Sequence, residues 1–384
     1  MRAGIIGVAV TFGLNGVAVA SWFARVPAAK DALALDAGAL GLLLLAMSAG
    51  AVLAMVTAGE VTHRLGARRA VRGAAVGVAA GLAVVGAGIG VWPSVRATGI
   101  GLFLLGYGSG TCNVAMNVEA AAVERLIGRT IMPRFHAVWS SGTVVAAGVA
   151  AAVAVRLPVV VHLTGVAVVT VVGTFVAARS FRHGTAGTAK SGVLAAWREP
   201  RTLLIGLLVL VLAFTEGTAN DWVAVAFVDG YAFGAAAGAV VFGVFVTSMT
   251  IGRVVGTVAL DRWGRSPVLV GSMVSAIVGT ALAVWSGEPV VAVGGVALWG
   301  LGTALGFPVG MSAAADEEER AAARVGVVAV IGYTAFLAGP PAVGLLGDHV
   351  GVLRALLVVP LLLVPALALV PAVRPVGSAP AGRG

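Results

Sequence analysis

The sequence predicts an all-α integral membrane protein, with twelve transmembrane helices in two pseudo-symmetric six-helix bundles. Three observations support this fold class: the composition, the spacing of the apolar runs and a set of motifs repeated in the two halves. Hydrophobic residues make up 59% of the chain and charged residues 11%, and the mean hydropathy is +1.04. A soluble domain carries about a quarter charged residues. The surface of this protein is therefore expected to face lipid.

The apolar runs have the length of membrane spans. A helix that crosses the bilayer core needs about 20 apolar residues, and it satisfies its own backbone groups in lipid. The expected spans lie near 4–22, 38–58, 70–92, 97–118, 135–155, 158–178, 202–228, 234–256, 266–286, 289–312, 325–346 and 351–371. This pattern predicts an N-terminal half at 1–178, a cytoplasmic linker at 179–201, a C-terminal half at 202–371 and a disordered cytoplasmic tail at 372–384. The first run ends in Ala18-Val19-Ala20, which resembles a signal-peptide cleavage site, but an even span count favours a first helix.

Short motifs recur at one spacing in the two halves. The matched pairs are His63-Arg64-Leu65-Gly66 with Asp261-Arg262-Trp263-Gly264, Gly106-x-Gly108 with Gly300-x-Gly302, and His136-x-x-Trp139-x-x-Gly142 with Tyr333-x-x-Phe336-x-x-Gly339. The offsets are 198 (261 − 63), 194 (300 − 106) and 197 (333 − 136) positions. Three matches in the same order indicate an internal duplication.

The distribution of positive charge predicts the orientation. With both termini in the cytoplasm, nineteen basic residues fall in inside segments. Five fall outside, namely Arg25, Lys30, Arg96, Arg156 and Arg354. Cytoplasmic loops of membrane proteins are enriched in Lys and Arg, so we expect a multi-pass protein of the cytoplasmic (inner) membrane. The net charge of +9 is explained in this way, and no basic stretch is long enough to follow a nucleic-acid backbone.

Several chemistries lack the residues that they need. The single cysteine, Cys112, excludes an internal disulfide and a cysteine-based metal site, and no histidines stand at ligand spacing. The many glycines include no Gly-Lys-Ser/Thr phosphate loop, so they are interpreted as helix-packing positions. No nucleophile–base pair is present. We therefore expect neither an enzyme nor a cofactor.

Twelve spans in two halves, with matched charged loops after spans 2 and 8, resemble the major facilitator superfamily. Its loop signature is roughly Gly-x-x-x-Asp-Arg-x-Gly-Arg-Arg. The first copy here keeps Gly59, Arg64, Gly66, Arg68 and Arg69 but has His63 at the acidic position, and the second keeps Asp261, Arg262, Gly264 and Arg265.

Within that superfamily, three segments are similar to the fucose-permease-like branch of bacterial permeases, many of which have no assigned substrate. They are Ser21-Trp22-x-x-Arg25-x-Pro27, Asn113-Val-Ala-Met-Asn117 and Arg134-Phe135-His136-Ala-Val-Trp139-Ser-Ser-Gly142. The proton-coupled sugar members of that branch carry acids in spans 1 and 4, where this chain has Phe23 and Ser109. Sugar–proton symport is therefore not implied.

Two acids in the seventh span are the candidates for proton coupling. Glu216 stands near the bilayer midplane, where a carboxylate costs a few kcal/mol, and burial there disfavours its charged form. It is either a proton- or cation-coupling acid or a structural hydrogen-bonded carboxyl. Asp221, about 7.5 Å further along the helix, is grouped with it but is better explained as a periplasmic gate or cap.

The candidate substrate-binding residues are polar or aromatic and lie in spans 1, 4, 5 and 7. Asn113 and Asn117 present two amides on one helix face, and buried amides need partners from a substrate or a neighbouring helix. The full set is Asn15, Asn113, Asn117, His136, Trp139 and Asn220. For His136 and Trp139, helix packing is the alternative. His162 is expected near the membrane interface.

The charged inner loops supply the candidate gating residues: Arg64, Arg68, Arg253, Asp261, Arg262 and Arg265. In this interpretation Arg64, Arg68 and Arg253 meet Asp261, Glu60 or Glu119, and the pairs break when the halves rock apart. Arg253 could instead extend towards the interface. The run Asp316-Glu317-Glu318-Glu319-Arg320 is expected to be a solvated loop.

The sequence thus predicts a monomeric secondary active transporter that moves a small polar or amphipathic organic solute by alternating access. Its substrate would bind at the midplane between spans 1, 4, 5 and 7, and its coupling partner would be protons or another ion. An exporter of the same fold, working as an antiporter, and a non-transporting receptor or scaffold remain as alternatives.

Overall fold

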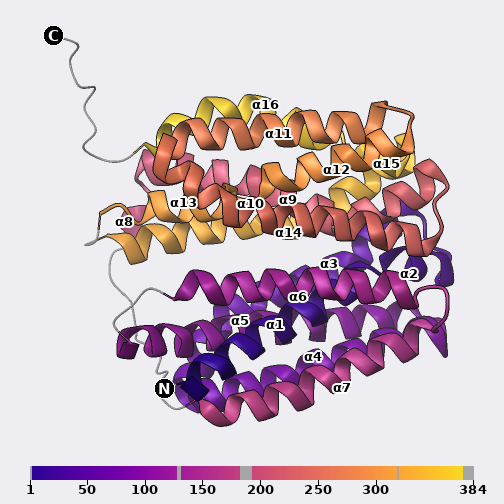
Figure 1. The fold of residues 1–384 in the computed structure, drawn as a ribbon, viewed down its shortest axis with the longest axis horizontal. Coiled ribbons are helices and arrows are strands. Elements are labelled where there is room, and N and C mark those ends of the chain that lie inside the picture. The colour runs from indigo at the N-terminus through magenta and orange to yellow at the C-terminus, as the bar shows by residue number, and fades with distance from the viewer. Residues whose placement is uncertain (1, 128–130, 182–192, 318–319, 375–384) are drawn as a thin grey trace. The chain divides into compact units, whose positions relative to one another are not determined.

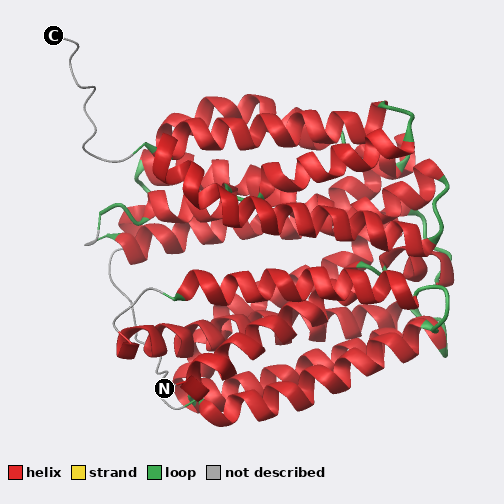
Figure 2. Ribbon diagram, viewed as in Figure 1, coloured by secondary structure: helices red, strands yellow, loops and turns green. Residues whose placement is uncertain are grey.

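The computed structural model describes residues 2–127, 131–181, 193–317 and 320–374. Within these ranges the regular structure is helical and no strand occurs (Figure 2). The elements are α1 (Arg2–Phe23), α2 (Val26–Ala32), α3 (Ala37–Leu65), α4 (Ala67–Gly90), α5 (Val95–Ile127), α6 (Met132–Val153), α7 (Val159–Ala177), η1 (Ala178–Ser180), α8 (Val193–Ala196), α9 (Pro200–Tyr231), α10 (Ala235–Trp263), α11 (Arg265–Trp285), α12 (Pro289–Thr303), α13 (Gly306–Ala314), α14 (Ala321–Val350), α15 (Val352–Ala355), α16 (Val358–Ala366) and η2 (Leu367–Val373).

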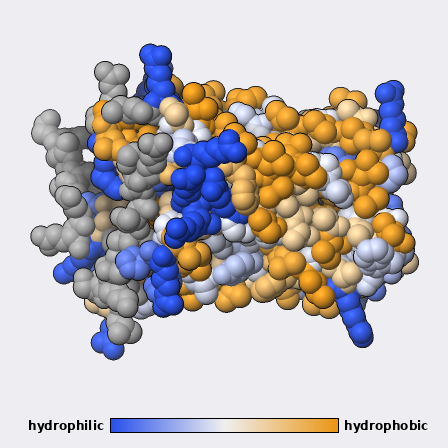
Figure 3. All heavy atoms as spheres, turned by 90° about the horizontal axis from the view of Figure 1, so that it is seen from below, coloured by the Kyte–Doolittle hydropathy of each residue, from blue (hydrophilic) through white to orange (hydrophobic). Residues whose placement is uncertain are grey.

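Eleven helical segments of the described chain are long and apolar enough to cross a membrane. Helix α5, with 33 residues, is about 50 Å long at 1.5 Å per residue and is the twelfth. Its glycines and its two asparagines keep its hydropathy below that of the others. Figure 3 shows hydrophobic residues over most of the middle of one face, with hydrophilic residues mainly towards the ends. The predicted all-helical membrane fold is confirmed.

The two matched charged loops have the same backbone geometry. Gly66 ends α3 and begins α4 with φ +76°, and Gly264 precedes α11 with φ +77°. A residue with a Cβ atom is strained in this region. The glycine in each copy of the motif therefore marks a tight turn between two long helices.

A second repeated feature is the close packing of α4 on α5 and of α11 on α12 (Figure 1). A Cβ atom added at Gly81 would lie 2.6 Å from the backbone nitrogen of Leu105, and one added at Gly295 would lie 2.7 Å from that of Ala283. Small residues allow helix backbones to approach this closely in membranes. The glycines predicted to pack helices do so in both halves.

The chain forms two compact units. Unit 1 comprises Met1–Gly187, Asn220–Thr247 and Pro340–Ala355, and unit 2 comprises Thr188–Ala219, Ser248–Gly339 and Leu356–Gly384. Helices α9, α10 and α14 each pass from one unit to the other. Residues 182–192 of the predicted linker and 375–384 of the predicted tail lie outside the described residues.

Candidate functional site

The middle of α9 carries an ion pair with α10. Arg253 Nη2 lies 3.1 Å from Glu216 Oε1, and the two side chains are 26% and 15% exposed. Taking two charges out of water is costly, and an ion pair of good geometry offsets that cost. From the sequence, a coupling role was expected for Glu216 and a gating role for Arg253. The structure joins the two side chains in one pair within unit 2.

Asp221 follows Glu216 on the same helix but has a different environment. Its side chain is only 9% exposed. Within the described part of the chain, no hydrogen bond or ion pair of the Asp221 carboxyl group is found. Its neighbour Thr218 is also buried, and the Thr218 hydroxyl has no partner in the same part of the chain. The ionised form of a carboxyl group is unfavourable in such a place, because no partner offsets the loss of water.

Three aromatic rings form a chain of contacts in unit 2, and one of them packs beside Glu216. The ring centroids of Phe307 and Tyr333 are 5.8 Å apart, and those of Tyr333 and Phe336 are 5.9 Å apart. A Cβ atom at Gly217 would lie 3.1 Å from the Phe336 ring, so this ring packs directly on α9 beside Glu216. We call Phe307, Tyr333 and Phe336 the aromatic cluster.

Sequence reasoning did not select the aromatic cluster, although a signal was present. Tyr333 and Phe336 occupy the positions that match His136 and Trp139 in the internal repeat. A candidate binding position in one half therefore pointed to its counterpart in the other. Phe307 had no such signal, because its proximity depends on how α13 packs against α14.

The corresponding region of unit 1 contains the predicted amides. Asn117 Nδ2 donates to Asn113 Oδ1 at 2.6 Å and to the Asn113 backbone oxygen at 2.8 Å. This contact confirms that the two amides share one face of α5. Asn15 on α1 is buried, and its Oδ1 has no hydrogen-bond partner in the described chain. Helix α1 contacts both α5 and α6.

Helix α6 brings the two predicted ring residues to α1. The His136 ring is exposed and meets Phe12 edge-on, with centroids 5.2 Å apart. Trp139 is partly buried against the core that contains Phe12, and the backbone oxygen of Trp139 contacts Gly16 so closely that a Cβ atom there would overlap it. The other predicted residue, Asn220, is partly exposed on α9, one helical turn after Glu216.

The gating candidates behave differently in the two motif copies. Arg64 pairs with Glu60 at 2.5 Å, but both side chains are exposed, at 75% and 57%, and such surface pairs contribute little stability. Arg68, Asp261 and Arg262 are exposed as well. The Arg262 guanidinium lies over the Trp263 ring, 5.7 Å from its centroid.

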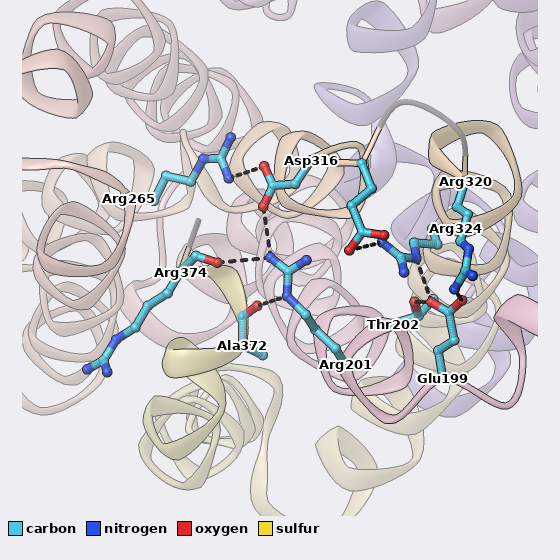
Figure 4. Close-up of polar contacts among 10 residues, drawn as sticks. Glu199, Arg201, Thr202, Arg265, Asp316, Arg320, Arg324, Ala372 and Arg374 are labelled. Atoms are coloured by element: carbon cyan, nitrogen blue, oxygen red, sulfur yellow. Dashed lines mark hydrogen bonds and ion pairs between the residues drawn. The ribbon is translucent and has the colours of Figure 1, made fainter. Parts of the chain in front are cut away.

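In the second copy, Arg265 is part of a charged network in unit 2 (Figure 4). Arg265 and Arg201 hold the two carboxylate oxygens of Asp316 at 2.6 and 2.8 Å. Arg201 also donates to the backbone oxygens of Ala372 and Arg374. The Asp316 side chain is 11% exposed. The expectation that the acidic run from Asp316 is a solvated loop was therefore wrong at its first residue.

A second cluster of ion pairs, drawn in the same view (Figure 4), comprises Glu199, Glu317, Arg320 and Arg324. The Arg324 guanidinium contacts both carboxylates, and Arg320 contacts Glu199 at 3.4 Å. The hydrogen bond from Arg324 lowers the pKa of Glu199 below its ordinary value, although partial burial acts in the opposite direction. The hydrogen bond from Arg324 lowers the pKa of Glu317 as well. The loop between α13 and α14 is thereby tied to the start of α9.

Comparison with known proteins identifies the family. The chain is 34% identical over 347 residues to an uncharacterised transporter, y4wD, of Sinorhizobium fredii, covering 89% of this chain and 90% of the relative. It is 30% identical over 342 residues to an uncharacterised MFS-type transporter of Yersinia pestis, covering 88% of each. The chain belongs to the major facilitator superfamily. No family model matches it.

Solved structures of this superfamily share the fold. A variant of the nucleoside transporter NupG superposes with a TM-score of 0.81 at 14% identity, covering 97% of this chain and 99% of NupG. The Escherichia coli fucose:proton symporter FucP gives 0.63 at 15% identity, covering 96% and 98%. At these identities the likeness shows the fold alone. The curated relatives and the apolar helices together show that the protein is a multi-pass membrane transporter of the major facilitator type and not an enzyme.

Proposed function

We propose that the protein is a proton-coupled secondary transporter that moves a small polar or amphipathic organic solute by alternating access. The observation that carries the proposal is the contrast between two acids on α9. Glu216 is paired with Arg253, and Asp221 is buried with no partner among the described residues. Two carboxyl groups in environments that favour opposite protonation states are a recurrent arrangement for proton chemistry. In this proposal Asp221 holds the proton and Glu216 is ionised.

The structure changes the relative weight of the two candidates. The sequence placed Glu216 first because of its midplane position. In the structure the Arg253 guanidinium stabilises the charge of Glu216, whereas no described residue stabilises a charge on Asp221. Proton release from Asp221 therefore requires a conformation that gives this carboxyl group water or a cation, which is how proton movement becomes coupled to alternating access.

The proposed substrate contacts fall into two groups. In unit 1 they are the linked amides of Asn113 and Asn117, together with Asn15, His136 and Trp139. In unit 2 the aromatic cluster lies beside the Glu216–Arg253 pair, and Asn220 continues the same helix. Amides, aromatic faces and few charges suit a solute with hydrogen-bonding groups and an apolar face.

Two further parts of the proposal rest on charge. The bias of basic residues supports an orientation with both termini on the cytoplasmic side of the inner membrane. Among the proposed inner-gate residues, Arg265 is held by Asp316 within unit 2, which fixes its position on that unit. Arg64, Arg68, Asp261 and Arg262 are exposed side chains of the two motif loops. We expect the protein to work as a monomer.

The test uses proteoliposomes that contain a pH-sensitive dye, screened with nucleosides, sugars, amino acids and lipophilic cations. The expected result is substrate-triggered proton movement that is lost in Asp221→Asn, while substrate counterflow remains. Asp229→Asn serves as the control acid on the same helix. If proton movement survives in Asp221→Asn and is lost in Glu216→Gln, Glu216 is the coupling acid. Uptake with no proton movement in the wild type would contradict proton coupling altogether.

A further inference from the structure

Several arginines gather where α4 and α7 meet at one end of unit 1. Arg68, Arg69 and Arg72 lie on the first two turns of α4, and Arg179 lies in η1, directly after α7. Helix α4 packs along α7 and also contacts η1 (Figure 1). The helix ends that carry these side chains are therefore next to each other. We call Arg68, Arg69, Arg72 and Arg179 the arginine cluster.

Arg72 is the member of the cluster whose position is fixed by its contacts. Its Nη2 donates to the backbone oxygen of Phe175 on α7 at 3.2 Å, and its guanidinium lies over the Phe175 ring, 5.3 Å from the centroid. The Arg72 side chain is partly buried. A ring face and a carbonyl oxygen hold the guanidinium in place, but they leave its positive charge without a counter-charge.

The charge of the arginine cluster is not neutralised within the described part of the chain. No carboxylate oxygen there lies within the 4.0 Å that defines an ion pair with any of its members. Arg64, one turn before Arg68, is different because it pairs with Glu60. Positive charge that is held at the edge of the hydrocarbon is unfavourable unless an anion accompanies it, and arginine does not lose its proton in proteins.

The surface beside the arginine cluster is apolar. Val76 on α4 is exposed, and so are Val172, Phe175 and Val176 on α7. Helix α4 and the segment Val159–Ser180 are both long and apolar enough to cross a membrane, so these side chains face lipid. A ligand that suits both parts of the surface has an anionic head and a hydrocarbon tail. A soluble anion would use only the arginines.

We propose that the arginine cluster binds the headgroup of an anionic phospholipid, whose acyl chains lie along the exposed valines of α4 and α7. The lipid phosphate accepts hydrogen bonds from Arg72 and Arg179 and thereby joins the two helices. A zwitterionic phospholipid fits less well, because its own cation would lie among the arginines. The site does not involve the acids of α9, so it stands or fails independently of proton coupling.

The test measures lipid binding to the purified full-length protein, stripped of lipid in detergent, by native mass spectrometry. Phosphatidylglycerol is compared with phosphatidylcholine that has the same acyl chains. We expect the wild type to bind phosphatidylglycerol about tenfold more tightly, and Arg72→Gln/Arg179→Gln to lose most of this preference. Arg262→Gln is the matched control, because it removes an arginine that also lies over an aromatic ring, and it should retain the preference.

Two results would overturn the proposal. One is an equal affinity of the wild type for the two lipids. The other is a preference that Arg72→Gln/Arg179→Gln keeps as fully as Arg262→Gln does. If the double variant fails to fold, photoreactive benzoylphenylalanine in place of Val176, with every arginine retained, decides the matter. In vesicles with equal amounts of both lipids, cross-linking mainly to phosphatidylglycerol supports the site, and equal cross-linking to both refutes it.

Discussion

The pair between Glu216 and Arg253 predicts strongly non-additive mutations. At 3.1 Å the attraction between the two charges is about 5 kcal/mol for an effective dielectric constant near 20. Desolvation removes part of it, but the loss of one partner leaves the other charge buried. We expect Glu216→Gln alone and Arg253→Gln alone each to lower the free energy of unfolding by about 3 kcal/mol, and the double variant to lose only about 1 kcal/mol.

The measurement is a double-mutant cycle by titration with a denaturing detergent, with the fluorescence of the eight tryptophans as the signal. The cycle isolates the interaction between the two side chains. Losses in the single variants that add up to the loss in the double variant, within about 0.5 kcal/mol, would show that the two groups do not depend on each other. The conclusion that Arg253 stabilises the charge of Glu216 would then be wrong, and with it the contrast drawn between Glu216 and Asp221.

Three other predictions follow from packing, backbone geometry and charge. A methyl group at Gly344 on α14 would overlap the backbone oxygen of Ala37, so Gly344→Ala should destabilise the protein by about 1–3 kcal/mol, measured by the same titration. Gly264→Ala forces a Cβ atom into φ +77° and should cost about 1 kcal/mol. Arg324 lowers the pKa of Glu199, so their pair stabilises the protein above the ordinary carboxyl pKa, and the contribution is lost as the pH falls through the lowered value. The free energy of unfolding of Glu199→Gln, measured from neutral to acidic pH, should fall less steeply than that of the wild type.

Matched controls are available in the same chain. Gly294 and Gly271 have no neighbouring atom within 4 Å of an added Cβ and have no positive φ, so alanine at these helix positions should be neutral or stabilising. If Gly344→Ala is as mild as Gly294→Ala, the close contact of α14 with α3 does not constrain the fold. If the free energy of unfolding of Glu199→Gln falls with pH as steeply as that of the wild type, Glu199 does not contribute to the pH dependence of stability.

Much of the fold could be predicted because it depends on local and periodic features. The length of apolar runs sets the spans, and the repeated motifs at one offset correctly indicated equivalent turns at Gly66 and Gly264. The spacing of Asn113 and Asn117 placed the two amides on one helix face, where they bond to each other. These features need only a helix period and a bilayer thickness.

The site could be predicted only in part, because its contacts join residues far apart in the sequence. Glu216 and Arg253 are separated by 37 positions, and no local pattern shows that α9 and α10 bring them together. Asp316 begins an acidic run that is typical of a solvated loop, but Arg201 and Arg265, from two different helices, contact it. His162 on α7 is buried and accepts a hydrogen bond from Arg25 Nε. This contact likewise depends on how α7 packs against the turn between α1 and α2.

The two prolines inside α14, Pro340 and Pro341, stand where the helix passes from unit 2 to unit 1. Proline removes a helical hydrogen bond and bends the helix at its own position, so the backbone is more pliable here than in the flanking turns. On one side of this joint the helix carries the aromatic cluster residues Tyr333 and Phe336. On the other, the Asp348 carboxylate accepts from the backbone nitrogen of Gly38 at 3.0 Å. The most pliable part of α14 therefore lies between the segment that carries two rings of the aromatic cluster and the segment that binds the start of α3.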